Sequence, residues 1–143
     1  MLHMIVEQTA KYPMRMEFVP ERNEFRELDC RSLASQRNFT KPYGWIKESG
    51  TPPAPHWDCI LMSDGQFELG DEVSVRVVGM FKRRDKDHKY IAVESDSTVN
   101  DFEELSNLEK EELYRLYPRI RDGEGWFGRE EALTCMQCDE KAL

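Results

Sequence analysis

The chain has 143 residues, a length that favours one domain over residues 1–143 rather than two independent folds. Hydrophobic residues make up 39% of it, enough to build a core, which excludes disorder throughout. Its 28 acidic against 20 basic side chains give a formal charge of −8 that repels a phosphate backbone, so we expect no nucleic-acid partner.

Two runs with partial alternation near the N-terminus predict a β-hairpin. They cover residues 15–19 and 25–30, and the proline and asparagine in residues 20–23 suit the turn between them. Residues 42–46 are predicted to form a short aromatic strand. Residues 50–55 are predicted to be a loop, because their prolines lack the N–H donors of a helix or central strand.

The middle of the chain is rich in β-branched residues. Three runs, at residues 59–62, 72–81 and 89–93, are separated by glycines or charged turns and predict three more strands. With the strands before them and helices after them, they indicate a mainly β fold: a small closed or half-closed barrel covered by C-terminal helices.

After Asp96 the hydrophobic pattern takes the helical period. Ser106 with Glu109 matches a capping box, and Pro118 ends the predicted helix. The apolar face is predicted to contain Leu105, Leu108, Leu113, Leu116 and Tyr117. A second helix is predicted from Gly128 to about Lys141.

Targeting signals and cysteines indicate the compartment. No run approaches the roughly 20 apolar residues that span a bilayer, and residues 1–13 do not resemble a signal peptide. We therefore expect a cytoplasmic protein with no membrane partner and reduced thiols. Cys135 and Cys138 have the spacing of a zinc or redox motif, but no strand directly precedes them and no second pair exists, which favours two thiols on or beside a terminal helix.

Several charged residues are candidates for a metal- or phosphate-binding site, and each also has a purely structural interpretation. In residues 82–89, Asp85 and Asp87 can point at one hard cation while lysines hold phosphate oxygens, or the segment is a solvated hairpin tip. Asp58 begins an apolar strand and is either a metal ligand or a capping residue. His56 is a metal ligand or an ordinary loop residue. Phosphate-loop and nucleophile-elbow motifs are absent, which disfavours nucleotide kinases and serine hydrolases.

Several segments resemble, in order and almost in register, the soluble family I inorganic pyrophosphatases. They lie at residues 43–46, 58–61, 69–71, 75–82, 89–93 and 124–126. The resemblance implies a five-stranded barrel of the OB type with two helices packed outside, Mg²⁺ as cofactor, and hydrolysis of pyrophosphate to phosphate. It also implies a homo-oligomer. Aromatic residues such as Trp126 and Phe127 either form its interface or pack against a helix.

The resemblance also implies a set of site residues. The substrate phosphates are contacted by Arg15, Arg31, Tyr43, Lys89 and Tyr117, and all of these except Arg15 are also catalytic. Metal binding falls to Glu17, Asp58, Asp85 and Asp87, and the family's earlier glutamate corresponds to Glu7.

The chain departs from the family at the metal-binding signature D-x-D-P-x-D. Its first two aspartates are replaced by Pro53 and Pro55, so only Asp58 remains. Another phosphate contact is lost where Pro118 replaces the lysine of the family's Tyr-Lys pair. His56, Asp64 and Glu48 are possible substitutes. Two hypotheses follow: a divergent Mg²⁺-dependent hydrolase with weakened activity, or a non-catalytic relative that binds a phosphate-bearing ligand or a protein.

Overall fold

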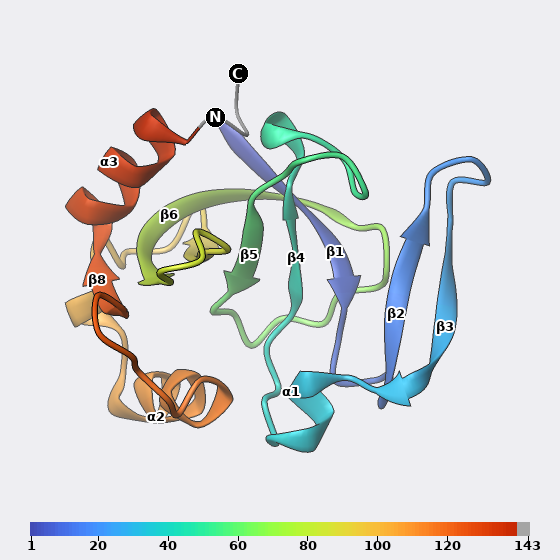
Figure 1. Cartoon of the computed structure of the whole chain (residues 1–143), viewed down its shortest axis with the longest axis horizontal. Coiled ribbons are helices and arrows are strands. Elements are labelled where there is room, and N and C mark those ends of the chain that lie inside the picture. Colours follow the sequence, from blue (N-terminus) through green and yellow to red (C-terminus); the bar gives the residue numbers. More distant parts are fainter. Residues whose placement is uncertain (140–143) are drawn as a thin grey trace.

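A closed five-stranded β-barrel forms the centre of the computed structural model, which describes residues 1–139 (Figure 1). Around the barrel the strands are, in spatial order, β1 (Leu2–Gln8), β4 (Tyr43–Ile46), β5 (Asp58–Leu61), β7 (Lys89–Glu94) and β6 (Glu72–Lys82). Pairing of β1 with β6 closes the ring, and β8 (Gly125–Gly128) pairs with the last part of β6. The predicted mainly β barrel is confirmed.

The central strands are buried on both faces, which explains why their sequences are almost continuously apolar. On β5, Cys59 and Leu61 belong to one core cluster, whereas Ile60 between them belongs to the other. Helix α3 (Arg129–Cys138) adds Ala132 to the first cluster, and α2 (Asn107–Leu116) adds two leucines to the second. The two helices therefore cover different parts of the barrel.

The predicted hairpin is confirmed as a separate two-stranded sheet that stands beside β1 (Figure 1). Its strands are β2 (Met14–Val19) and β3 (Glu24–Arg31). The rings of Phe18 and Phe25 lie 5.3 and 6.4 Å from that of Trp45 on the barrel strand β4. This aromatic contact holds the hairpin against the barrel.

Short helical segments connect the strands. Helix α1 (Leu33–Gln36) follows the hairpin, and the 3-10 turns η1 (Lys47–Ser49) and η2 (Phe102–Glu104) follow β4 and precede α2. Among residues 1–139, no helix is long and apolar enough to cross a membrane. The four cysteines are free, and Cys135 and Cys138 lie on α3; the predicted end of this helix near Lys141 lies outside the described residues.

Helix α2 begins with the predicted capping box. Ser106 Oγ accepts a hydrogen bond from Glu109 N at 3.1 Å, and the Glu109 carboxylate accepts one from Ser106 N at 2.9 Å. One residue of the predicted apolar face is wrong: Leu108 is 75% exposed. Leu108 is five positions before the buried Leu113, so the two side chains lie about 140° apart around the helix axis.

Removing this cap is expected to destabilise the fold modestly. Ser106→Ala leaves the Glu109 amide without its side-chain acceptor, and we expect the free energy of unfolding to fall by about 1 kcal/mol. Urea denaturation followed by circular dichroism measures the change. Ser106→Thr keeps the hydroxyl and should lose much less, and equal losses in the two variants would contradict the role of the cap.

Candidate functional site

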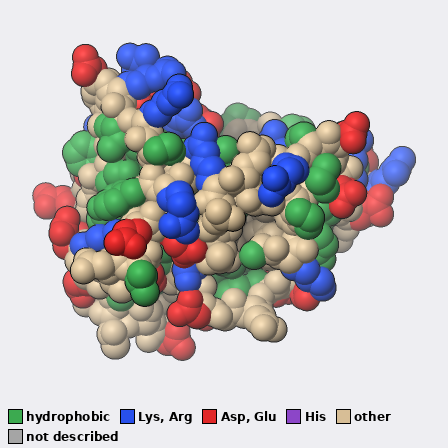
Figure 2. Space-filling model, turned by 90° about the horizontal axis from the view of Figure 1, so that it is seen from below, with side chains coloured by type: hydrophobic (Ala, Val, Ile, Leu, Met, Phe, Trp, Pro, Cys, Tyr) green, Lys and Arg blue, Asp and Glu red, His purple; other side chains and the backbone are tan. Residues whose placement is uncertain are grey.

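A cavity of about 970 Å³ lies between the β2–β3 hairpin and the barrel. All of the predicted site residues except Asp85 line it: Arg15, Glu17, Arg31, Tyr43, Asp58, Asp87, Lys89 and Tyr117. Figure 2 shows lysine and arginine side chains gathered at the centre and upper left of the lower face, although the chain is negatively charged overall. The fold therefore brings distant cationic residues to one cavity.

Lys89 is the buried centre of the site. The parallel pairing of β5 with β7 sets Asp58 opposite Lys89, and Lys89 Nζ donates to Asp58 Oδ2 at 2.8 Å and to Asp87 Oδ2 at 3.2 Å. Burial alone would lower the pKa of the ammonium, but the charges of these carboxylates raise it above its ordinary value. Lys89 is therefore a fixed positive charge.

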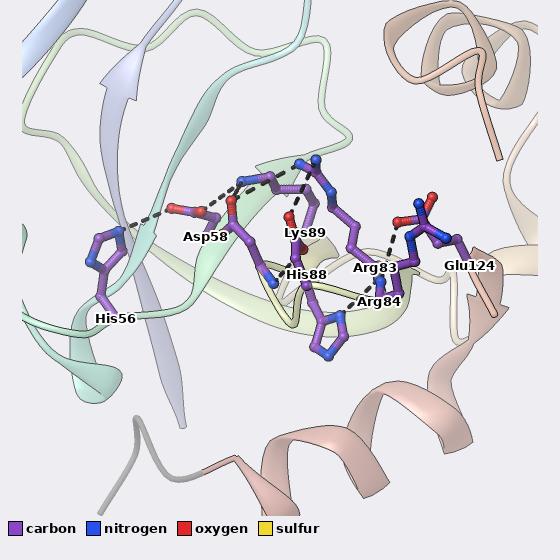
Figure 3. Close-up of polar contacts among 9 residues, drawn as sticks. His56, Asp58, Arg83, Arg84, His88, Lys89 and Glu124 are labelled. Atoms are coloured by element: carbon purple, nitrogen blue, oxygen red, sulfur yellow. Dashed lines mark hydrogen bonds and ion pairs between the residues drawn. The ribbon is translucent and has the colours of Figure 1, made fainter. Parts of the chain in front are cut away.

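On the other side of Asp58 lies the imidazole of His56 (Figure 3). His56 Nε2 lies 3.0 Å from Asp58 Oδ1, and Nδ1 lies 2.8 Å from the carbonyl oxygen of Ala54. Both partners are acceptors, so both contacts are hydrogen bonds only when the ring carries two protons. The bond to Asp58 raises the pKa of His56 and so favours the protonated ring. Asp58 thus lies between the ammonium of Lys89 and the imidazole of His56.

The Asp58 carboxylate stays ionised in this setting. Burial works to raise its pKa, but the hydrogen bond from His56 and the charge of Lys89 outweigh burial and lower it. Glu7, on β1, has the opposite balance: burial first and then the charge of Asp58 raise its pKa to about 7. The cavity therefore holds one carboxylate that is firmly charged and one that takes up a proton easily.

The arginines from the hairpin complete the cationic lining. Within residues 1–139, neither Arg15 nor Arg31 has a carboxylate within ion-pair distance, and Arg31 Nη2 donates to Ser35 Oγ at 2.9 Å. Arg26, in contrast, is paired with Glu17 at 3.2 Å. The Arg15 and Arg31 guanidiniums can therefore each take an anionic ligand, and phosphate oxygens match their geometry.

Tyrosine hydroxyls provide neutral donors at the same place. Burial, followed by the charge of Asp58, raises the pKa of Tyr43 well above its ordinary value. Burial also raises the pKa of Tyr117. Both phenols keep their protons at neutral pH, so each can donate a hydrogen bond to an anion.

Asp85 lies outside the cavity lining. Its Oδ1 accepts a hydrogen bond from Asp87 N at 3.0 Å within the β6–β7 turn, and its Oδ2 lies 3.7 Å from Arg83 Nη2. The Asp85 carboxylate therefore does not share the cavity with Asp58 and Asp87, and it accepts the N–H of its own turn instead. In the part of the chain that the structure describes, no group of three or more His, Cys, Asp or Glu side chains is placed to hold a metal ion.

Comparison with known proteins assigns this chain to a family. The family model for inorganic pyrophosphatase matches residues 4–140. The chain belongs to the inorganic pyrophosphatase family. A search of curated proteins found no match.

Solved structures of pyrophosphatases have a similar fold. An inorganic pyrophosphatase from Ehrlichia chaffeensis is 22% identical, with a TM-score of 0.75 over 95% of this chain and 90% of that one. One from Neisseria gonorrhoeae is 20% identical, with a TM-score of 0.72 over 94% and 86%. One from Helicobacter pylori is 18% identical, with a TM-score of 0.71 over 98% and 91%. At such identities the likeness shows the fold.

The carboxylates of this pyrophosphatase-family site fit magnesium only in part. Each oxygen of Asp58 accepts one hydrogen bond and keeps another lone pair, and Asp87 also lines the cavity. Mg²⁺ commonly binds through one or two carboxylates together with substrate phosphates. Pro53 lines the cavity without offering a ligand, and Pro55 is absent from the lining. The residues present fit an ion that arrives with phosphate rather than several ions held by protein alone.

Two residues at the candidate site of this pyrophosphatase-family chain, Arg83 and Glu124, were not predicted from the sequence. Arg83 lines the cavity and its Nη1 lies 4.0 Å from Asp87 Oδ2. Glu124 fixes the turn that carries Asp87, because its carboxylate accepts hydrogen bonds from Arg84 N at 3.2 Å and Arg121 N at 3.1 Å (Figure 3). The run of charges in residues 82–89 is the only sequence signal that pointed to Arg83.

Proposed function

We propose that this chain binds pyrophosphate or a related phosphoanhydride in the cavity and hydrolyses it to phosphate with Mg²⁺, at a lower rate than relatives with the full set of carboxylates. The observation that carries the proposal is the gathering of Arg15, Arg31 and Lys89 around one cavity of a pyrophosphatase-family barrel. Three unrelated surface cations would not share a cavity with two protonated tyrosines.

In this proposal the cationic side chains bind and orient the substrate. Arg15 and Arg31 each pair with phosphate oxygens in the two-pronged way that guanidinium allows. Lys89, held still by Asp58 and Asp87, provides a buried charge that stabilises negative charge on the leaving phosphate. The hydroxyls of Tyr43 and Tyr117 donate to the remaining oxygens.

Asp58 and Asp87 are the residues that would hold magnesium. When bound, the ion neutralises phosphate charge and lowers the pKa of a coordinated water toward neutrality. Glu7 and His56 line the same cavity, and Glu7 can accept a proton from water near neutral pH. The roles of Glu17 and Asp85 as further ligands stay predictions, since Glu17 pairs with Arg26 and Asp85 with its own turn.

The low rate follows from the two prolines. Without carboxylates at Pro53 and Pro55, the cavity attracts hard cations less strongly and offers fewer groups to orient the attacking water. We also propose, from the resemblance alone, a cytoplasmic homo-oligomer. Phe127 on β8 is 37% exposed and is the candidate for the subunit interface. Light scattering after gel filtration measures the molar mass in solution and so tests whether the chain forms an oligomer.

A second function is favoured by the contacts of Asp58. Because His56 and Lys89 already neutralise this carboxylate, the cavity can hold a phosphate-bearing ligand without metal and without catalysis. This alternative is a binding protein that uses the same cations.

Phosphate release from pyrophosphate separates the two functions. The wild type is assayed in parallel with Mg²⁺, Mn²⁺, Zn²⁺ and a chelator, with Arg31→Ala as the site variant and Arg22→Ala, on the exposed hairpin turn, as the control. We expect slow release with Mg²⁺ that Arg31→Ala reduces and Arg22→Ala does not. Release below the no-enzyme blank with every metal would reject hydrolysis of pyrophosphate.

Glu124 is expected to support pyrophosphate binding by holding the β6–β7 turn in place. Glu124→Ala removes the acceptor of two backbone N–H groups and loosens the segment that carries Asp87, so pyrophosphate affinity should fall roughly fivefold, equivalent to about 1 kcal/mol. Calorimetric titration measures the change. Glu111→Ala, at an exposed position of α2, is the control. Equal affinities in the two variants would show that the turn does not depend on Glu124.

A further inference from the structure

The cavity continues from its charged residues along an apolar wall. Its residues follow the length of the hairpin: Phe18 and Val19 lie near the turn, Met16 in the middle of β2, and Leu33, Ala34, Phe39 and Leu116 at the end next to α1. Leu33 remains 39% exposed there, although it is a large apolar side chain. Water therefore contacts apolar surface directly beside the cationic groups.

Pyrophosphate alone leaves this wall unused. It is a small ion of phosphorus and oxygen, and it gains nothing from contact with apolar side chains. The cavity of about 970 Å³ is at the upper end of the roughly 300–1,000 Å³ that pockets for organic ligands occupy. Its size and lining therefore suit a ligand with an organic part.

Polar groups on the wall are largely engaged in holding the hairpin. Gln8 Nε2 donates to the carbonyl oxygens of Tyr12 and Met14, and its Oε1 accepts from Met16 N. Ser32 Oγ accepts from Ser35 N, and Gln36 Nε2 donates to the Arg31 carbonyl oxygen. With these groups occupied, the wall favours an apolar group over one that needs hydrogen bonds, such as a nucleobase.

We propose that the cavity takes a diphosphate monoester with an apolar organic group. Its diphosphate lies on Arg15, Arg31 and Lys89, and its apolar group lies against Leu33 and Ala34 of α1. The inference rests on the proposed function, because the diphosphate uses the same cationic site. It adds the class of the organic substituent, which neither the family nor the cationic residues define.

Methyl diphosphate and hexyl diphosphate test the inference, because they have the same charge and differ only in the apolar group. In calorimetric titrations with a chelator present, we expect hexyl diphosphate to bind the wild type at least tenfold more tightly than methyl diphosphate. Each methylene group that is fully buried contributes roughly a factor of four.

Matched variants locate the effect. Leu33→Ser should bring the hexyl-to-methyl affinity ratio close to one, and Ala34→Ser, at the next position of α1, should lower it as well. Leu133→Ser on α3 is the control, since Leu133 is 38% exposed but outside the cavity lining, and should keep the wild-type ratio. Circular dichroism verifies that each variant is folded.

The outcomes separate this inference from the proposed function. Equal affinity of the wild type for the two esters, or a ratio that both Leu33→Ser and Ala34→Ser leave unchanged, would overturn the inference. The proposed function would then stand if pyrophosphate is still bound and hydrolysed. Failure of pyrophosphate and of both esters to bind would overturn both.

Discussion

Replacing Lys89 with methionine is expected to abolish pyrophosphate binding and to lower the free energy of unfolding by about 3 kcal/mol. The ammonium is buried and donates to both Asp58 and Asp87, so its removal leaves Asp58, whose side chain is 14% exposed, with only His56 to balance its charge. Breaking a buried ion pair by removing one partner is strongly destabilising, because the other charge stays out of water.

Urea denaturation and calorimetric titration of the same variant measure these two effects. Lys47→Met is the matched control: Lys47 Nζ donates to Glu72 at 2.7 Å, but both side chains are exposed and such pairs contribute little. If Lys89→Met loses no more stability than Lys47→Met, the Asp58–Lys89 pair is not a structural centre. If it still binds pyrophosphate like the wild type, Lys89 is not part of the site.

Restoring carboxylates at Pro53 and Pro55 is expected to raise Mg²⁺-supported hydrolysis by roughly tenfold or more. Even residues that only orient metal ligands change metal affinity or activity by about 10–100-fold, and new ligands should do at least as much. The rate of phosphate release and the Mg²⁺ concentration for half-maximal rate measure the effect in the double variant.

The two single variants control each other, because they make the same change in the same loop. Pro53 lines the cavity and Pro55 does not, so Pro53→Asp should account for most of the gain. A gain from Pro55→Asp alone would contradict the observed position of the loop. A wild type that already hydrolyses pyrophosphate as fast as a relative with all its carboxylates would contradict the argument from lost ligands.

Much of the fold could be predicted from local patterns. The alternating runs of the hairpin, the apolar strand at residues 59–62 and the capping box of α2 each reflect one dominant local interaction. Strand β8 was not predicted, because two of its four residues are glycines with poor strand propensity, and pairing with β6 determines its conformation. The number of barrel strands and their OB-type arrangement came from the family resemblance, since the partners of β1 lie far away in sequence.

The sequence allowed most residues of the candidate site to be predicted, but not the hydrogen bonds and ion pairs that they form. The resemblance named Asp58 and Lys89, and the parallel β5–β7 register brings them together. Sequence could not show that the Asp85 carboxylate accepts the amide of Asp87, because that depends on the turn in which Lys86 adopts a φ of 67°. The contacts of the His56 ring were equally hidden, since they depend on a backbone carbonyl on one side and Asp58 on the other.

Calorimetric titration with pyrophosphate, first with a chelator and then with Mg²⁺, tests most directly whether the cavity is an anion site within a negatively charged protein. We expect the wild type to bind pyrophosphate under both conditions. Arg31→Ala should bind it clearly less tightly, and Arg22→Ala, on the hairpin turn, should bind it like the wild type. No detectable binding by the wild type under either condition, or binding that Arg31→Ala leaves unchanged, would contradict the assignment of the cavity as an anion site.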